Sequence, residues 1–434
     1  MTVSRRPPRP VPVPGTTDSP VAPADVVAYT SPRDGLPPVT DSPEALQDAA
    51  RALASGKGPV SIDAERASGF RYGQSAYLIQ LRRAGSGTIL IDPLATGDLD
   101  PLARALDGPE WILHAADQDL PCLADLGLVP SALFDTELAA RLLGRDHVGL
   151  GAVTEETLGL RLAKDHAAAD WSIRPLPVSW LIYAALDVEL LADLREALST
   201  ELVEIGKSEW AAQEFEFERT RPPRPAKVDP WRRTPRAGRA VRSRRSLAVL
   251  RELWIAREEL AADLDRTPSK VLSHHALIAA AVARPTSRRK LTALKEFSSR
   301  QARQHQERWW KAVDRAMSLP DSQLPPLHAP LPDGELPQPR SWGRHHAEAA
   351  RMLEVVRATV RSRANELRLP QELLLAPDSQ RHLAWDLGRV HESGAPIDTA
   401  TGAMAERLAA LEARPWQIDQ VSAALSEALT AALA

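Results

Sequence analysis

The sequence predicts an α/β domain followed by all-α helical domains. Over residues 41–218, strand-like apolar runs alternate with runs of helical periodicity, which is typical of a mixed sheet flanked by helices. Residues 243–320 and 342–434 carry helical periodicity alone, and a basic or proline-rich segment precedes each of them. A chain of 434 residues is too long for one ordinary domain, so several domains are expected.

The chain begins with a segment rich in Pro, Ser and Thr. Residues 1–40 hold few large apolar side chains, so we expect a disordered or extended tail there. Two arginines stand near the start, but no apolar stretch follows them, which argues against a secretory signal. No run approaches the roughly 20 apolar residues that span a bilayer. We therefore expect a cytoplasmic protein with no membrane partner.

The α/β region divides into predicted elements in the following order. Strands are expected over 59–65, 75–83 and 87–94, with Gly-containing turns between them. A helix over 99–108, a short buried strand over 110–116, and helices over 117–127, 134–144 and 151–160 follow. The run 179–202 has apolar residues at helical spacing throughout, so we expect one long helix.

The second half of the chain is predicted to be helical. Residues 219–242 carry many Lys and Arg among prolines and are expected to be a linker. Helices should then cover 246–266, 267–284 and 285–297 and a segment through Trp309 and Trp310, before a Pro-rich linker at 321–341. In the last region, "VRSRANELRLPQELLL" weakly repeats "REELAADLDRTPSKVL" of the first helical region.

Composition excludes several classes of function. The formal net charge is −3, so any basic surface must be local. Cys122 is the only cysteine, which excludes a disulfide framework and a cysteine-rich zinc site. No G-x-x-x-x-G-K-[ST] motif occurs, so no nucleotide cofactor is expected.

Two groups of acidic residues stand at the ends of predicted strands. Asp63 and Glu65 are two positions apart in a strand, so they project from the same face and repel each other. A bound cation would offset that repulsion, although an exposed turn is the alternative. Asp119 opens a helix after a buried strand, and Asp117 precedes it. One of these two acids could simply cap the helix.

A third group lies on the long predicted helix. Tyr183 and Asp187 are four residues apart and share one helix face, although an exposed acid beside a core tyrosine is the alternative. Asp63, Glu65, Asp119 and Asp187 together would suit two divalent cations, Mg²⁺ or Mn²⁺, that bracket a phosphodiester. Tyr183 would then orient the attacking water.

These motifs resemble those of ribonuclease D, in the DEDD superfamily of 3′–5′ exonucleases. The stretch "DAERASGFRYGQSAYLIQL" is similar to the family's first motif, "HAADQDL" to its second and "YAALD" to its third. The approach "DWSIRPLPVSWLIYAALDVELL" also matches, with Trp180 in place of the family's usual Gln. The resemblance implies a ribonuclease-H-like α/β fold and the tyrosine subtype of the superfamily.

The resemblance also implies roles for individual residues. Asp63, Glu65, Asp119 and Asp187 would bind the metal ions, and Tyr183 would position the water nucleophile. Further positions are expected to contact nucleic acid, namely Gln80, His114, Lys164 and Arg174, although a solvated lysine is the alternative for Lys164. Asp135 matches a recurrent family position and could equally be a helix cap.

The first helical region, 243–320, resembles the helicase-and-RNase-D C-terminal (HRDC) domain. The stretches "DRTPSKVLSHHALIAAA" and "RPTSRRKLTALKEFS" carry that likeness, and 342–434 is expected to be a second, divergent copy. The basic segment before them is interpreted as a phosphate-binding strap. In it, Trp231 would stack on a base beside Arg232, Arg233 and Arg236. A flexible connector is the alternative.

The sequence therefore predicts a metal-dependent 3′–5′ exoribonuclease of the ribonuclease D type. It would act as a monomer on single-stranded RNA 3′ ends, and the family resemblance points to tRNA precursors. One alternative is a DNA exonuclease of the same superfamily, because the acids do not separate RNA from DNA. Another is a catalytically silent RNA-binding scaffold.

Overall fold

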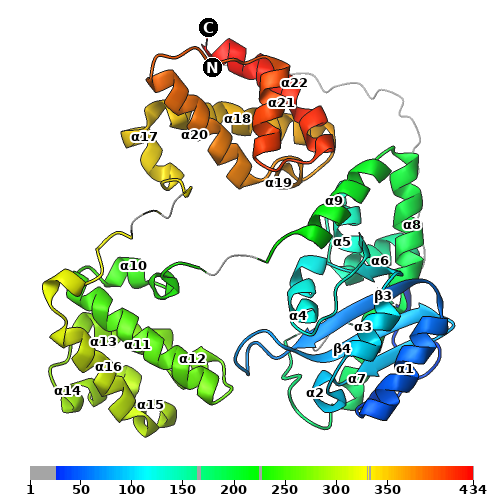
Figure 1. Ribbon diagram of the computed structural model, residues 1–434, viewed down its shortest axis with the longest axis horizontal. Coiled ribbons are helices and arrows are strands. Elements are labelled where there is room, and N and C mark those ends of the chain that lie inside the picture. The colour runs from blue at the N-terminus through cyan, green and yellow to red at the C-terminus, as the bar shows by residue number, and fades with distance from the viewer. Residues whose placement is uncertain (1–25, 164–167, 224–226, 330, 332–333, 434) are drawn as a thin grey trace, which may run out of the picture.

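A computed structural model describes residues 26–163, 168–223, 227–329, 331 and 334–433. Figure 1 shows three units: an α/β unit, a helical unit in the middle of the sequence, and a C-terminal helical unit. Within these residues, no helix is both long and apolar enough to cross a bilayer.

A six-stranded mixed sheet forms the centre of the α/β unit, with strand order β2-β5-β4-β3-β6-β7. The pairs of β3 with β4 and of β4 with β5 are antiparallel, and the remaining pairs are parallel. The strands are β2 (Val39–Thr40), β3 (Lys57–Arg66), β4 (Ala76–Ala84), β5 (Gly87–Ile91), β6 (Glu110–Leu113) and β7 (Ala132–Asp135). This sheet confirms the predicted fold class.

Helices cover both faces of this sheet. They are α1 (Pro43–Ser55), α2 (Pro93–Thr96), α3 (Asp100–Leu106), η1 (Ala116–Gln118), α4 (Leu120–Ala124), α5 (Thr136–Leu142), α6 (Leu150–Leu158), α7 (Val178–Glu189), α8 (Leu191–Glu204) and α9 (Ser208–Thr220). Ile62 and Ala64 of β3 join the core that α1 and α3 cover. Because side chains alternate along a strand, Asp63 and Glu65 face the other side, where α7 packs.

The amino-terminal tail is shorter than predicted. Residues 26–40 include β2 and also β1 (Val27–Tyr29), which pairs in parallel with β8 (Leu160–Leu162). The backbone N–H of Arg33 donates to buried Glu189 at 2.8 Å and holds this segment on α7. Short strands of this kind have no pattern of their own, because their pairing partners lie far away in the sequence. The rest of the predicted tail lies outside the described residues.

Two further predictions in the α/β unit were wrong. The expected single helix over 179–202 is two helices, α7 and α8, which meet at Leu190. Leu190 has near-helical torsion angles, and neither Gly nor Pro stands at the break to mark it in the sequence. The strand β7 was taken as the start of a helix, because four residues are too few to show alternation.

The middle unit has a core of its own. Its helices are η2 (Pro230–Arg233), α10 (Ala237–Ala240), α11 (Arg244–Asp263), α12 (Pro268–Val271), α13 (His274–Ala283), α14 (Arg288–Thr292), η3 (Lys295–Phe297), α15 (Arg300–Gln304), α16 (Gln306–Ser318) and η4 (Asp321–Gln323). Trp309 and Phe297 are fully buried in that core, and Trp231 and Val241 pack into it. The second half of the predicted basic linker is therefore part of a folded unit.

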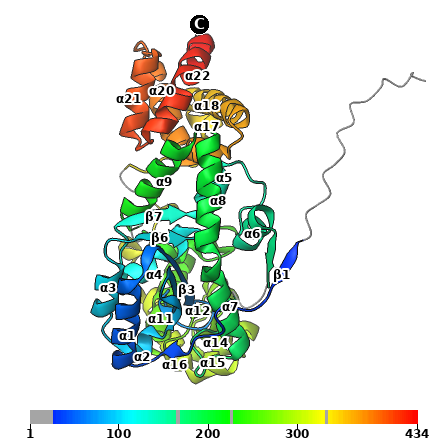
Figure 2. The same ribbon diagram turned by 90° about the vertical axis from the view of Figure 1, so that its right-hand side faces the viewer.

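The C-terminal unit shares its core with the α/β unit. It contains η5 (Pro339–Ser341), α17 (Trp342–His345), α18 (Ala347–Glu366), α19 (Gln371–Leu374), α20 (Pro377–Glu392), α21 (Thr401–Ala410) and α22 (Pro415–Leu433). One hydrophobic cluster runs from Ile112 and Phe134 through α8 and α9 into α18, α20 and α22. In Figure 2 this unit stands directly on α8 and α9. The second proline-rich linker is also partly packed, since Leu324 joins the middle core and Leu336 this one.

Buried charge joins α9 to the C-terminal unit. Glu214 accepts hydrogen bonds from Arg414 at 2.7 and 3.0 Å and from the Trp416 indole at 2.7 Å. Beside them Trp210 stacks on Trp416, with ring centroids 4.8 Å apart. We refer to Glu214, Arg414 and Trp416 as the Glu214 node.

The middle unit meets the α/β unit through fewer, more exposed contacts. The loop after β3 reaches the turn between α11 and α12, where Phe70 O accepts from Thr267 N at 3.0 Å. Asp265 accepts from the Tyr72 backbone at 3.2 Å and pairs with Arg71 at 3.3 Å. The sequence offered no sign of this docking point.

Candidate active site

A cleft of about 690 Å³ opens where β3, the turn after β6, α6 and α7 come together. Asp63 and Glu65 reach it from β3, Asp119 from the turn, and Tyr183 and Asp187 from α7. The N-terminus of α6, with Gly149 and Gly151, forms part of the wall. The structure thus brings five predicted residues into one cavity from segments up to 124 positions apart, from position 63 to position 187.

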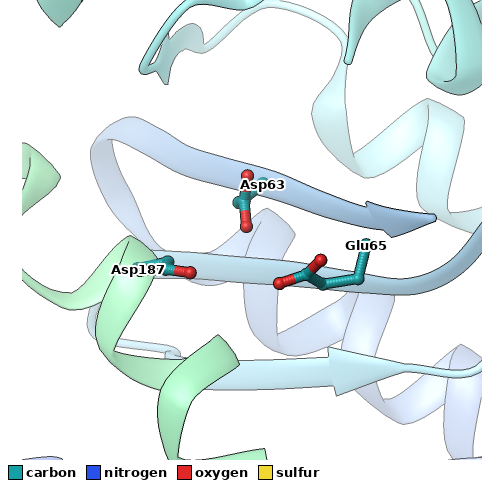
Figure 3. A group of neighbouring side chains, drawn as sticks. All are labelled: Asp63, Glu65 and Asp187. Atoms are coloured by element: carbon teal, nitrogen blue, oxygen red, sulfur yellow. The ribbon is translucent and has the colours of Figure 1, made fainter. Parts of the chain in front are cut away.

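Three of the carboxylates converge closely. Asp63, Glu65 and Asp187 each offer one oxygen atom, and these oxygens lie within 4.8 Å of one another. Figure 3 shows the three side chains pointing toward one another, Asp63 and Glu65 from the strand and Asp187 from the helix. Oxygen atoms at this spacing suit a hard divalent cation.

Asp119 completes the group. It is 5 % exposed and its carboxyl group hydrogen bonds with that of Asp63. Asp117, the other acid of the second motif, is exposed and does not line the cleft. The structure therefore places Asp119 and not Asp117 in the cleft, and its role as the matching acid of that motif stays a prediction.

The four acids hold their protons unusually tightly. Burial, and then repulsion from Asp63, Asp187 and Asp119, raises the pKa of Glu65 to about 10. Burial and the neighbouring Asp63 raise the pKa of Asp119 to about 8. The pKa values of Asp63 and Asp187 are raised as well, chiefly by burial. Such a cluster favours cations, because they can replace the retained protons.

Tyr183 is linked directly to the acid cluster. Its hydroxyl donates to the carboxylate of Asp187, one helical turn away. Burial and the surrounding acids raise its pKa, so the phenol keeps its proton at neutral pH. Trp171, fully buried and 6.4 Å from Tyr183 between ring centroids, packs behind it.

Asp135 holds the turn that carries Asp119. It caps α5 by accepting from the backbone N–H groups of Glu137 and Leu138 at 2.8 and 3.2 Å. The same carboxylate also accepts from Ala115 N at 3.1 Å and Ala116 N at 2.7 Å. The helix-cap interpretation thus described one part of the role of Asp135. The other part is its contact with the turn after β6, through Ala115 and Ala116.

Two of the predicted nucleic-acid contacts are internal. Gln80 is fully buried on β4 opposite Asp63, so it cannot touch RNA, and neither of its amide atoms has a hydrogen-bond partner. Arg174 pairs with Asp92 and donates to the carbonyl of Tyr77 at 2.7 Å, which makes it a structural clamp. His114 does line the cleft, but burial lowers its pKa to about 4, so it is neutral there. Lys164 lies outside the described residues.

The predicted basic strap is only partly available. Trp231 is 3 % exposed within the middle core, which corrects the expectation that it stacks on a base. Arg232 covers its ring and donates to the carbonyl of Pro326. Arg233 and Arg236 are exposed, so they remain candidates for phosphate contacts.

One residue of the cleft was missed by the sequence analysis. Arg66 follows Glu65 directly and lines the cavity, with its guanidinium 3.2 Å from Asp119 Oδ1. Its position next to an acidic pair was the available signal. The pairing with Asp119 left no signal in the sequence, because Asp119 is 53 positions further along the chain.

Comparison with known proteins agrees with this geometry. A family model described as 3′–5′ exonuclease matches residues 38–203, an HRDC domain model matches 246–313, and a model described as 3′ to 5′ exonuclease C-terminal domain matches 335–429. Ribonuclease D of Pseudomonas paraeruginosa is 34 % identical over 279 residues, which span 61 % of this chain and 72 % of that protein. Ribonuclease D of Gluconacetobacter diazotrophicus is 33 % identical over 61 % of this chain and 68 % of that one. The chain belongs to the ribonuclease D family.

Solved structures extend the likeness over nearly the whole chain. A crystal structure of a protein from Bifidobacterium adolescentis is 36 % identical with a TM-score of 0.83, covering 93 % of this chain and 99 % of that one. Escherichia coli RNase D, described as an exoribonuclease involved in structured RNA processing, is 25 % identical with a TM-score of 0.65. That comparison covers 91 % of this chain and 98 % of the other.

Family membership settles the class of activity. The chain is a 3′–5′ exoribonuclease that hydrolyses phosphodiester bonds, and the comparisons do not favour the alternatives of a DNA exonuclease or a silent scaffold. Exonucleases of this superfamily use divalent metal ions, and the carboxylate cluster is where such ions fit in this chain. The second HRDC-like copy stays a prediction. In its favour, a long helix, a short helix that begins at or just after a proline, and a third helix recur in both helical units.

Proposed function

We propose that the acidic cleft is the active site and that it removes nucleoside 5′-monophosphates from RNA 3′ ends. Asp63, Glu65, Asp119 and Asp187 would hold two divalent cations there. The observation that carries the proposal is the convergence of three carboxylates within 4.8 Å, with Asp119 and Tyr183 in the same cleft. A structural role does not explain this arrangement, because clustered buried acids destabilise a fold unless cations offset them.

The donor set favours Mg²⁺ or Mn²⁺. All four candidate ligands are carboxylates, no thiolate lines the described part of the cleft, and His114, the imidazole there, is not among the groups whose ligand atoms converge. Hard cations prefer such oxygen ligands. When bound, a pair of these cations lowers the pKa of a water nucleophile and stabilises the departing oxygen.

The chain's own residues would orient the reaction. Tyr183 keeps its phenolic proton and donates it to Asp187, so its hydroxyl oxygen can accept a hydrogen bond from the nucleophilic water, and the phenol is a poor general base. Its bond to Asp187 fixes the direction of the hydroxyl. Asp135 holds the backbone of Ala115 and Ala116, and through this turn it fixes the position of Asp119.

We further propose that the substrates are single-stranded 3′ ends of structured RNAs, tRNA precursors among them. Exposed cations on the middle unit support this proposal, including Arg233, Arg236, Arg289 and Lys290. Such residues bind phosphates without reading base edges, so weak sequence preference is expected. The described relative from E. coli acts in structured RNA processing. We expect the protein to act as a monomer.

A single gel assay tests the proposal. The purified chain is incubated with 5′-labelled RNA that carries a single-stranded 3′ tail, in Mg²⁺, in Mn²⁺ or in EDTA, beside DNA of the same sequence. We expect a ladder that shortens from the 3′ end with either metal and no shortening in EDTA. Shortening in EDTA would contradict the metal-bound cleft. Equal rates on DNA would contradict the RNA preference.

A further inference from the structure

Arg66 holds an unusual place in the cleft. It is the last residue of β3, and its guanidinium lies 3.2 Å from Asp119 Oδ1. A second guanidinium nitrogen of the same side chain donates to the backbone carbonyl of Gln118 at 2.7 Å. The carbonyl contact does not involve Asp119, so it can hold the side chain in the cleft even when the ion pair opens.

Arg66 is also the only Lys or Arg among the described residues that line this cavity. His114 is the other basic side chain there, and it is neutral. Of the charged side chains that a phosphodiester meets in the cleft, this guanidinium is therefore the one that attracts it, and the others are the acids.

The ion pair with Asp119 conflicts with the role of Asp119 as a ligand. A carboxylate oxygen that coordinates a divalent cation is a weak partner for a guanidinium, because the two positive charges repel each other. Two divalent cations would also neutralise all four carboxylates. The guanidinium would then be the uncompensated charge of the cleft, and the substrate brings one negative charge at each linkage.

We propose that Arg66 occupies the place of a cation beside Asp119 in the metal-free protein and binds a phosphate of the RNA 3′ end once cations are bound. This inference rests on the proposed function of the acidic cleft. A guanidinium suits the task because it presents several donors in a plane and binds phosphate oxygens in pairs. Arg66 would thus be a substrate-binding residue at the 3′-terminal linkages.

The alternative is a purely structural ion pair that neutralises Asp119. Both ideas predict a weaker enzyme when Arg66 is replaced, so activity alone does not separate them. They differ in whether the effect depends on the charge of the RNA phosphate. Neutralising that phosphate and replacing Arg66 should have overlapping effects only if the two groups touch.

The experiment measures binding of short fluorescent RNAs to the full chain in Ca²⁺, with a gel to show that the RNA stays intact. One RNA has a charged 3′-terminal linkage and the other a methylphosphonate there, with the same 2′-deoxy sugar in both. For wild type we expect roughly 10- to 100-fold weaker binding of the neutral RNA. Arg66→Gln should bind the charged RNA more weakly by a similar factor and lose nothing further on the neutral one.

Two variants serve as controls. Arg51→Gln removes an exposed arginine from α1, away from the cleft, and should bind both RNAs as wild type does. Arg66→Lys keeps the charge without the planar donors and should fall between wild type and Arg66→Gln. It also keeps the test informative if the glutamine variant does not fold.

A second readout follows the metal alone. Thermal shift with Mn²⁺ should give Arg66→Gln an affinity equal to or tighter than that of wild type, because the competing guanidinium is gone. The inference would be overturned if Arg66→Gln discriminated between the two RNAs as strongly as wild type does. Weaker Mn²⁺ binding by Arg66→Gln would also overturn it, and so would a wild type that binds the charged and the neutral RNA equally well. Failure of the proposed function is recognised separately, since wild type would then show no metal-dependent RNA shortening.

Discussion

Two sites of buried charge in this chain differ in what surrounds the charged groups. In the Glu214 node, a guanidinium and an indole N–H meet the carboxylate oxygens directly. In the cleft, four carboxylates face one another, and Arg66 forms the only described ion pair with them. The first site satisfies its charge within the fold and joins two units. The second site has too few cationic side chains to balance its carboxylates, so bound protons or cations must do so. An active site that binds metal ions and phosphates requires such an arrangement.

The largest expected difference between the two sites is in catalysis. Asp187→Asn keeps the shape of the side chain but removes a ligand charge. We expect RNA shortening to fall by more than about 100-fold, since even residues that only support metal ligands cost 10- to 100-fold. Stability in EDTA should stay equal or rise, because one repelling carboxylate is gone. The labelled-RNA assay and thermal melts in EDTA measure both.

Asp117→Asn is the matched control for this variant. It removes an acid of the same motif that is exposed and outside the cleft. It should retain activity within a few-fold of wild type. Full activity in Asp187→Asn, or loss in Asp117→Asn, would show that the cleft acids are wrongly assigned.

The Glu214 node should respond in the opposite way. Glu214→Gln leaves Arg414 largely buried without its counter-charge, so we expect a loss of about 3 kcal/mol in the free energy of unfolding. Activity per folded molecule should remain, because the node does not line the cleft. Urea denaturation gives the stability, and the RNA assay gives the activity. A variant as stable as wild type would show that the node contributes little to holding the two units together.

The pH dependence of the metal-free protein sharpens the contrast. The folded pKa of Glu65 is about 10 and that of Asp119 about 8, against 4.5 and 3.8 for the free side chains. At a pH between the free and the folded pKa of either group, the folded chain holds a proton that the unfolded chain has released. Stability in EDTA should therefore fall as pH rises from about 5 to 8, by up to about 1.4 kcal/mol per pH unit for each proton retained.

Melts across this pH range, in EDTA and in saturating Mn²⁺, provide the measurement. Bound cations replace the protons, so the slope should flatten in Mn²⁺. Glu65→Gln should also flatten it in EDTA, because the variant has lost one of the titrating groups. A metal-free protein whose stability rises through this range would contradict the account of the cluster.

The smallest effect is expected at the exposed contact between the middle and α/β units. Asp265→Asn removes the ion pair with Arg71. The carboxylate of Asp265 in this pair is half exposed. Exposed ion pairs contribute less than about 1 kcal/mol, so global stability should hardly change. Hydrogen exchange at the amide of Tyr72 should become faster, since it donates to Asp265. Unchanged exchange there would mean that the contact does not persist in solution.

The sequence predicted the fold class and the members of the acid cluster because local patterns carry both. Asp63 and Glu65 share a strand, and Tyr183 and Asp187 share a helix face, so spacing alone aligns each pair. The convergence of the pairs came from the family resemblance, since it depends on strand order. Short strands such as β7 and the break at Leu190 left no signal that local periodicity could detect.

Predictions about which side chains are exposed were less accurate than predictions about which acids share the cleft. Trp231 and Gln80 were expected at the RNA surface and are buried instead. Whether a side chain faces solvent is decided by elements that pack from elsewhere in the chain, here α11 over Trp231 and α7 over β4. A basic or polar composition shows which residues could bind RNA, but not which of them the fold leaves accessible.

Asp135 shows how narrow the choice of side chain can be at one position. Its two oxygens accept from four backbone N–H groups, two in the turn after β6 and two in the first turn of α5. Asparagine has almost the same shape, yet its NH₂ group would face another donor whichever way the amide turned. A change of one heavy atom, from oxygen to nitrogen, would thus set two donors against each other in the turn that carries Asp119. Asparagine is usually treated as the mildest replacement for aspartate, but here it should disturb the site from a distance.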